Sequence, residues 1–124
     1  MNIEKLVADR ELCEQIPADD FLDTAFCWHY TKVKMSSYRQ IGYKEWVLER
    51  STRDKIIQAR KMGEHIFPAP TLQEIMAAMP YCRVYKKTTA TFIAVHEKTR
   101  FAINKNGAEA ALKLWMELKG VENE

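Results

Sequence analysis

The chain has 124 residues, of which 47% are hydrophobic and 29% charged, a composition typical of a soluble globular domain without disulfides. Its net charge of +2 is too small to predict a nucleic-acid partner, and its apolar runs are far shorter than the ~20 residues that cross a bilayer. Three cysteines without paired spacing predict reduced thiols, and residues 1–5 lack the apolar core of a secretion signal, so we expect a cytoplasmic protein without a membrane segment.

Charge is unevenly distributed along the chain. Residues 1–30 carry two basic and seven acidic side chains, whereas residues 31–61 carry nine basic and three acidic ones. Blocks of opposite sign can attract each other within the fold or across a homo-oligomer. They can equally form a solvated, mixed surface, which is the simpler interpretation.

The first two predicted elements are a helix and a strand. Apolar residues at helical spacing predict a helix over residues 2–15, which ends before Pro17. Aromatic and β-branched residues predict a strand over residues 25–34, with Phe26, Trp28 and Tyr30 on one face.

A second strand and a second helix are predicted next. Residues 43–49 fit a strand that pairs with the first, although the same residues could also form a helix. Residues 51–62 fit a short helix that Ser51 and Asp54 can cap and Gly63 can close.

A rigid joint is predicted at residues 66–70, because Pro68 and Pro70 exclude helix there. Thr71 and Glu74 have the spacing of a capping box, which predicts that a new helix begins directly after the joint. This helix is short, since Pro80 ends it.

Beyond this helix the apolar period changes from helical to alternating. Alternation over residues 81–104 predicts three short strands joined by tight turns, an antiparallel meander. Asn106 can cap a final amphipathic helix from Gly107 to about Lys119, which Gly120 stops. We therefore expect a single α+β domain over residues 1–124, in the order α-β-β-α-α-β-β-β-α, with helices covering an antiparallel sheet.

Part of the sequence resembles a known group of proteins. Residues 68–75, the meander and residues 108–118, with residues 21–28 upstream, resemble small uncharacterised proteins that phages and integrated prophages of gut anaerobes encode. The resemblance implies a cytoplasmic accessory protein of a mobile element. The group has no assigned activity, so the resemblance implies no catalytic or binding residues.

Motifs of common enzyme chemistry are missing from the chain. It contains no phosphate-binding loop, dinucleotide fingerprint, zinc-protease motif or paired CxxC. Cys27 and His29 would point the same way from a strand, as a thiol beside a base or as two metal ligands. Neither chemistry is complete without further groups, so we expect a packed sheet face there, and neither catalytic residues, a metal nor a cofactor.

A basic stretch coincides with the meander. It comprises Arg83, Lys86, Lys87, Arg100 and Lys105, with Tyr81, Tyr85 and Phe101 interleaved. Basic sheets with exposed aromatic residues bind single-stranded nucleic acid, whereas Lys and Arg on edge strands also prevent aggregation. The small net charge favours edge protection.

The sequence thus predicts a non-catalytic accessory protein that binds a protein partner and can self-associate. The alternative is a weak nucleic-acid-binding module that uses the basic meander, and a small enzyme based on Cys27 and His29 ranks third.

Overall fold

The computed structural model describes residues 6–33, 43–79, 81–97, 99–103 and 106–120. In chain order its elements are α1 (Arg10–Cys13), β1 (Phe26–Val33), β2 (Tyr43–Arg50), α2 (Arg53–Lys61), β3 (Ile66–Pro68), α3 (Leu72–Ala77), β4 (Arg83–Lys86), β5 (Phe92–His96), β6 (Thr99–Ile103) and α4 (Gly107–Lys119). Pro80, which was expected to end the third helix, and Lys105 of the basic stretch lie outside the described part.

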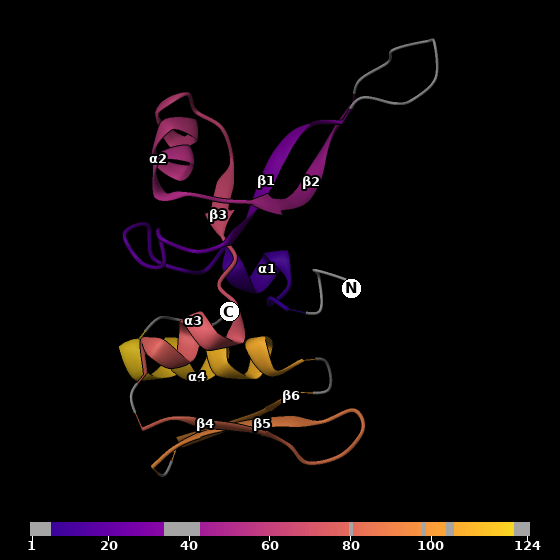
Figure 1. Ribbon diagram of the computed structural model, residues 1–124, viewed down its shortest axis with the longest axis vertical. Helices are drawn as coiled ribbons and strands as arrows, with labels where there is room; N and C mark the ends of the chain where they lie inside the picture. Colours follow the sequence, from indigo (N-terminus) through magenta and orange to yellow (C-terminus); the bar gives the residue numbers. More distant parts are fainter. Residues whose placement is uncertain (1–5, 34–42, 80, 98, 104–105, 121–124) are drawn as a thin grey trace.

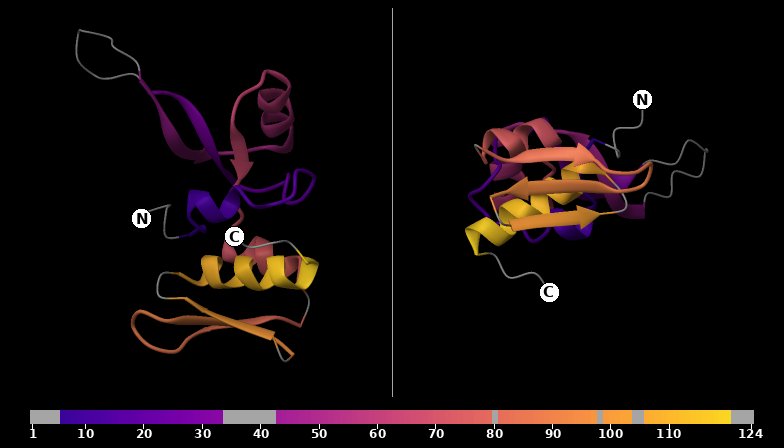
Figure 2. Two further views of the ribbon diagram at one scale, coloured as in Figure 1. Left: turned by 180° about the vertical axis from the view of Figure 1, so that it is seen from behind. Right: turned by 90° about the horizontal axis from the view of Figure 1, so that it is seen from below.

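The architecture is α+β, as predicted, but it has two antiparallel sheets where the sequence indicated one. The first sheet has the order β2-β1-β3, and the second, the meander sheet, has the order β4-β5-β6. The two sheets lie at opposite ends of the molecule (Figure 1), with α1, α3 and α4 between them. Helices α3 and α4 lie on one side of the meander sheet (Figure 2).

The β1-β2 hairpin confirms the strand interpretation of residues 43–49. Trp28 pairs with Leu48, and Cys27 pairs with Glu49. Phe26 and Trp28 pack on the main core, while Cys27 belongs to a smaller cluster on the opposite face. The two faces therefore divide as the alternation predicted.

Strand β3 was not predicted. It is only three residues long and pairs with β1, with Pro68 opposite Cys27. Proline is tolerated on an edge strand, because its missing N–H can lie on the side without a partner. The N–H of Ala69 then donates to the carbonyl of Phe26 at 2.9 Å, so the predicted rigid joint is held against β1.

The predicted helix over residues 2–15 is wrong in length within the described residues, because α1 is a single turn. Val7 forms an isolated bridge with Thr71, and its carbonyl accepts a hydrogen bond from Asn106 Nδ2 at 3.2 Å. These tertiary contacts hold the chain extended before Asp9, whose carboxylate caps α1 by accepting the N–H of Leu12 at 3.0 Å. Val7 and Leu12 of the apolar pattern are buried nevertheless, whereas Leu6 is 39% exposed.

Helix α2 has a different N-cap from the one predicted. Thr52, rather than Ser51 or Asp54, accepts the N–H of Lys55 at 3.1 Å. Gly63 follows the helix with φ +78°, a left-handed conformation that favours glycine. Of the helix residues, Ile56 and Ala59 are buried, as expected of a surface element.

The later caps agree with the sequence prediction. Thr71 and Glu74 form the capping box of α3. Asn106 caps α4 by accepting the N–H of Glu109 at 2.7 Å, and Gly120 ends α4 with φ +75°. Strand β5 begins at Phe92, and the β4-β5 connection is a wider loop than the predicted tight turn, in which the N–H of Lys87 donates to the carbonyl of Thr91.

The main core surrounds α4. It includes Leu112, Leu114 and Met116 of α4, all fully buried, and draws in residues of α1, α3 and both sheets. Trp28 of β1 packs on it and donates from its indole nitrogen to the carbonyl of Ala8 at 3.3 Å. The meander sheet is therefore attached to the rest of the molecule through α4.

Candidate nucleic-acid interface

The register of the meander sheet determines which of its basic residues share a face. Arg83 lies opposite Val95, and Val95 lies opposite Arg100, so the three form one row across the strands. Directly opposite residues of antiparallel strands point to the same side of a sheet. The two arginines therefore belong to the same face.

The opposite face of the meander sheet packs against α4. Val84, Phe92 and Phe101 pack on the main core, and Ala94 is fully buried in it. A methyl group built on Gly107, the first residue of α4, would lie 3.3 Å from Val84 and 3.4 Å from Phe92. These contacts identify the helix-covered side.

The remaining side, here called the outer face, is not covered by any described element (Figure 2, right). Its residues are Arg83, Tyr85, Ile93, Val95, Arg100 and Ala102. Both arginines are exposed, and Tyr85 is 48% exposed. Ile93 is buried although it belongs to neither core cluster, and its cross-strand neighbours are Tyr85 and Ala102. The outer face thus has an apolar centre flanked by guanidinium groups and a phenol.

The other predicted binding residues do not all join this face. Lys86 pairs with Phe92, so it belongs to the helix-covered side, where its Nζ lies 5.7 Å from the centre of the Phe92 ring. Lys87 lies in the β4-β5 loop and is exposed. Lys105 lies outside the described residues. The structure therefore groups two of the five predicted residues, together with Tyr85.

The charge of the outer face is predominantly positive. Within the described residues, neither Arg83 nor Arg100 takes part in an ion pair. Glu97 is the single acidic residue of the strands and turns from 81 to 103, and it lies in the β5-β6 turn with φ +53°. Tyr81, just before β4, is 93% exposed. An anion approaching this face would meet cations and aromatic rings.

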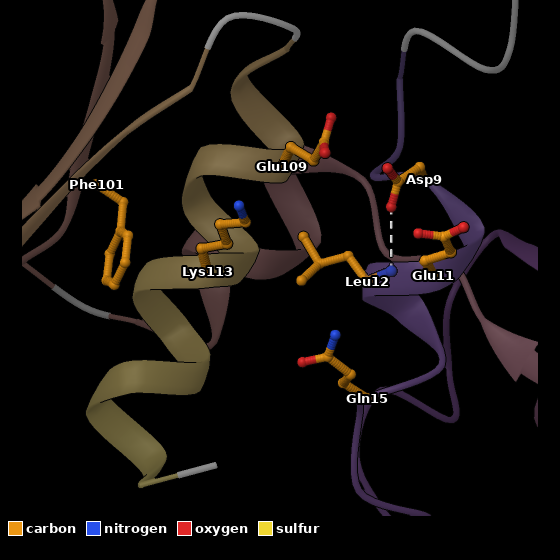
Figure 3. Close-up of a pocket in the computed structure, with 7 residues that line it drawn as sticks. All are labelled: Asp9, Glu11, Leu12, Gln15, Phe101, Glu109 and Lys113. Carbon is orange, nitrogen blue, oxygen red and sulfur yellow. Dashed lines mark hydrogen bonds between the residues drawn. The ribbon is translucent and has the colours of Figure 1, made fainter. Parts of the chain in front are cut away.

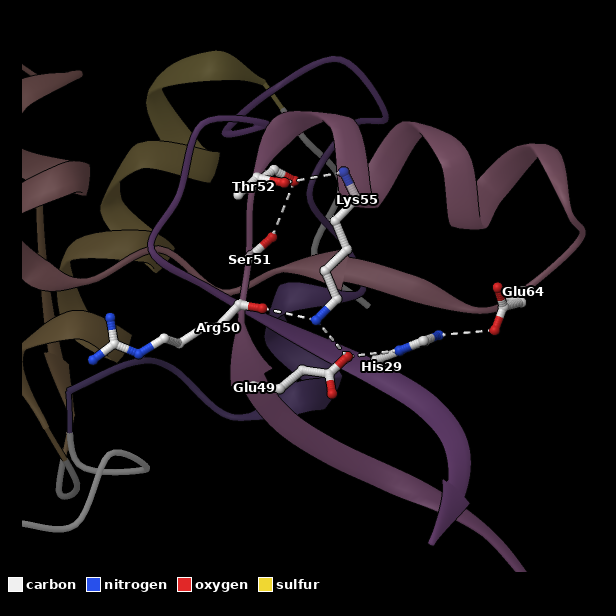
Figure 4. Close-up of polar contacts among 7 residues, drawn as sticks. All are labelled: His29, Glu49, Arg50, Ser51, Thr52, Lys55 and Glu64. Atoms are coloured by element: carbon white, nitrogen blue, oxygen red, sulfur yellow. Dashed lines mark hydrogen bonds and ion pairs between the residues drawn. The ribbon is translucent and has the colours of Figure 1, made fainter.

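The Cys27–His29 pair does not form a nucleophile–base arrangement. Both ring nitrogens of His29 face carboxylates instead, Nδ1 at 2.7 Å from Glu49 Oε1 and Nε2 at 3.1 Å from Glu64 Oε1 (Figure 4). Burial raises the pKa of the Cys27 thiol, and this exceeds the lowering by a hydrogen bond with Ser51 and by the charge of Lys55. A neutral, buried thiol is a poor nucleophile.

An acidic hollow between α1, α4 and β6 was not anticipated from the sequence. Asp9, Glu11 and Glu109 line it, with Lys113 as the one cation among its lining residues (Figure 3). Glu109 is 5% exposed, so this carboxyl group lies within the core side of α4. Of its neighbours at helical spacing, Leu112 is apolar whereas Asn106 and Lys113 are polar, so no local pattern signalled this burial.

Among the described residues, a basic side chain of the second charge block approaches an acidic side chain of the first at the start of α2. Arg53 Nη1 lies 4.0 Å from Asp23 Oδ2, and Arg60 donates to the carbonyl of Ala18 at 2.6 Å. The first is a long contact between exposed side chains, which contributes little to stability. Asp19 and Asp23 of the first block are exposed, and so are Arg53, Asp54 and Lys61 of α2, as in a mixed surface.

The cysteines, the metal-ligating side chains and the helices bear on other classes of site. Cys13, Cys27 and Cys82 are all free and buried. Among the described side chains, no three His, Cys, Asp or Glu residues are placed to hold a metal ion together. None of the described helices has the length and apolar content of a bilayer span.

Comparison with protein-family models, curated proteins and solved structures finds no match for this chain.

Proposed function

We propose that this chain is a non-catalytic binding protein that holds single-stranded nucleic acid on the outer face of the meander sheet. The observation that carries the proposal is the shared orientation of Arg83, Tyr85 and Arg100 on a sheet face that no described element covers. Guanidinium groups bind phosphates, and a phenol ring stacks on bases of any sequence.

The spacing of these groups suits an extended strand. Neighbouring strands of a sheet lie about 4.8 Å apart, so Arg83 and Arg100, on either side of β5, are separated by about 10 Å at their backbones. The apolar centre of the face lies between them. A single strand can thus cross the sheet with phosphates at the two arginines and a base over the centre or on Tyr85.

Binding by this face would depend strongly on salt. Each phosphate contact with a single strand contributes about 0.7 to the slope of log affinity against log salt concentration. Two arginine contacts therefore contribute about 1.4 to this slope. At ~0.05 M salt, removal of either contact should weaken the affinity for the single strand roughly tenfold.

Fluorescence anisotropy with a labelled oligothymidine, at low and moderate salt, tests this proposal. Arg83→Ser with Arg100→Ser should remove most of the affinity and flatten the slope. Lys61→Ser with Lys119→Ser removes the same charge from exposed positions outside the meander, and should change binding only slightly. Absence of binding by the unaltered protein at low salt, or equal losses in both double variants, would refute the proposal.

The protein partner predicted from the sequence would meet the same surface. An acidic segment could pair with Arg83 and Arg100, but would gain little from Tyr85 as a stacking surface. A labelled poly-glutamate peptide in the same assay separates the two ligands: preference for the peptide would replace nucleic acid by an acidic protein segment.

A further inference from the structure

His29 occupies a position at which its protonation state must affect its contacts. Its side chain is 12% exposed and lies between two carboxylates from different elements, Glu49 of β2 and Glu64 of the turn between α2 and β3 (Figure 4). The separations from the two ring nitrogens are 2.7 and 3.1 Å. The imidazole ring thus bridges two segments that are far apart in sequence.

Both contacts together require a hydrogen on each ring nitrogen. A neutral imidazole has one N–H, and its other nitrogen presents a lone pair. That lone pair would face a carboxylate oxygen, which has no hydrogen to share when it is ionised. Only the imidazolium form can donate to Glu49 and to Glu64 at the same time.

The surrounding charges decide which contact survives deprotonation. Lys55 of α2 donates to Glu49 Oε1 at 2.9 Å and to the carbonyl of Arg50 at 2.8 Å. Burial tends to raise the pKa of Glu49, but hydrogen bonds from Lys55 and His29 outweigh this and hold the pKa below its usual value. Glu49 is therefore an ionised acceptor with two donors.

The Glu64 carboxylate has fewer contacts than the Glu49 carboxylate among the described residues. Its side chain is 39% exposed, and within the described residues its carboxylate contacts no other partner than His29. Of the remaining titratable groups nearby, Cys27 on the same face of β1 is a neutral buried thiol, and His65 lies on the aromatic side with Tyr30 and Trp46. A neutral His29 would keep the shorter contact to Glu49 and lose Glu64.

We propose that His29 is a proton-dependent latch that ties the α2–β3 turn to the first sheet when protonated and releases Glu64 when neutral. The turn is a single short connection, in which Gly63 adopts φ +78° and the N–H of Glu64 donates to the carbonyl of Ala59. Glu64, Met62 and His65 also line an open hollow with Tyr30, Thr31 and Lys44. Release of Glu64 would thus alter one wall of this hollow.

The latch can be tested by amide hydrogen exchange and by NMR of the histidine ring nitrogens in the full chain. Both are measured at about pH 5 and at about pH 8.5, which bracket the range in which histidines ordinarily titrate. We expect two protonated ring nitrogens in His29 at the lower pH. Protection factors for residues 63–66 should then be roughly fivefold higher than at the higher pH, the factor that a single partly exposed ion pair gives.

Glu64→Gln is the decisive variant, because an amide side chain can donate or accept and so can contact either form of His29. It should abolish the pH-dependent step in protection while leaving the fold intact, since the position is exposed. His65→Gln is the control and should retain the step. A step that persists in Glu64→Gln, or that is absent from the unaltered protein, would overturn the latch.

Discussion

Glu74 should contribute more to stability than a helix cap ordinarily does. One carboxylate oxygen accepts the N–H of Thr71 at 2.8 Å, which completes the capping box, and the other accepts the N–H of Ala25 at 2.9 Å. Ala25 precedes β1 and is 49 residues away, so the side chain joins the start of α3 to the start of the first sheet. Substitution by alanine would remove both contacts.

The expected loss of unfolding free energy in Glu74→Ala follows from the surroundings of the two N–H groups, those of Thr71 and Ala25. A hydrogen bond to a charged group contributes about 1.5–3 kcal/mol when its loss leaves a buried donor. The contact to Thr71 is partly buried, whereas Ala25 is exposed and its N–H can be hydrated after the substitution. We therefore expect Glu74→Ala to lower the free energy of unfolding by about 2–3 kcal/mol, close to the sum of one full and one reduced contribution.

Urea unfolding followed by tryptophan fluorescence measures this cost against two controls. Thr71→Ala removes the cap hydroxyl alone and should cost about 1 kcal/mol. Glu74→Gln retains one acceptor oxygen, so its cost should lie between those of the other two variants. If Glu74→Ala costs no more than Thr71→Ala, the contact to Ala25 contributes nothing to stability and the reasoning is refuted.

Two further predictions concern the core and the charge network. Leu112→Ala, at a fully buried position of α4, should cost about 2–5 kcal/mol in the same urea assay, whereas Leu118→Ala, 43% exposed on the same helix, should cost less than about 1 kcal/mol. Because the pKa of Glu49 is below its ordinary value of 4.5, its contribution is present above that pH and disappears as the pH falls through the lowered value. Glu49→Gln should therefore be less stable than the unaltered protein at neutral pH, and the difference should shrink below about pH 4.5; a difference that stays constant with pH would contradict this.

The elements that the sequence predicted well are those whose signals are local. The capping box of α3 and the limits of α4, from Asn106 to Gly120, depend on side chains within a few residues of each helix end. The N-terminal helix failed because long-range contacts override its periodicity: the bridge of Val7 with Thr71 and the bond from Asn106 to its carbonyl are invisible in a local pattern. Strand β3 was missed for the same reason, since a three-residue segment that ends in Pro68 and is soon followed by Pro70 resembles a loop until β1 supplies its partner.

The candidate site was predictable only in part. Alternation alone places Arg83 and Tyr85 on one face of β4 and Lys86 on the other. Whether Arg100 joins Arg83 depends on the register of β4, β5 and β6, which the glycine-free turns of this meander did not specify. The carboxylates around His29 come from β2 and from the α2–β3 turn, so only the folded chain brings them together.

Edge protection and ligand binding make opposite predictions for Tyr85. Both arginines lie on edge strands of the meander sheet, so solubility alone could account for them. It does not account for a half-exposed aromatic ring on an edge strand, which adds apolar surface where protection is needed. If the face binds single-stranded nucleic acid, Tyr85→Ser should weaken oligothymidine binding roughly 5- to 100-fold, while Tyr85→Phe should retain most of it, because the stacking ring remains. If the arginines only protect the edge, Tyr85→Ser should instead raise solubility and leave no binding to lose.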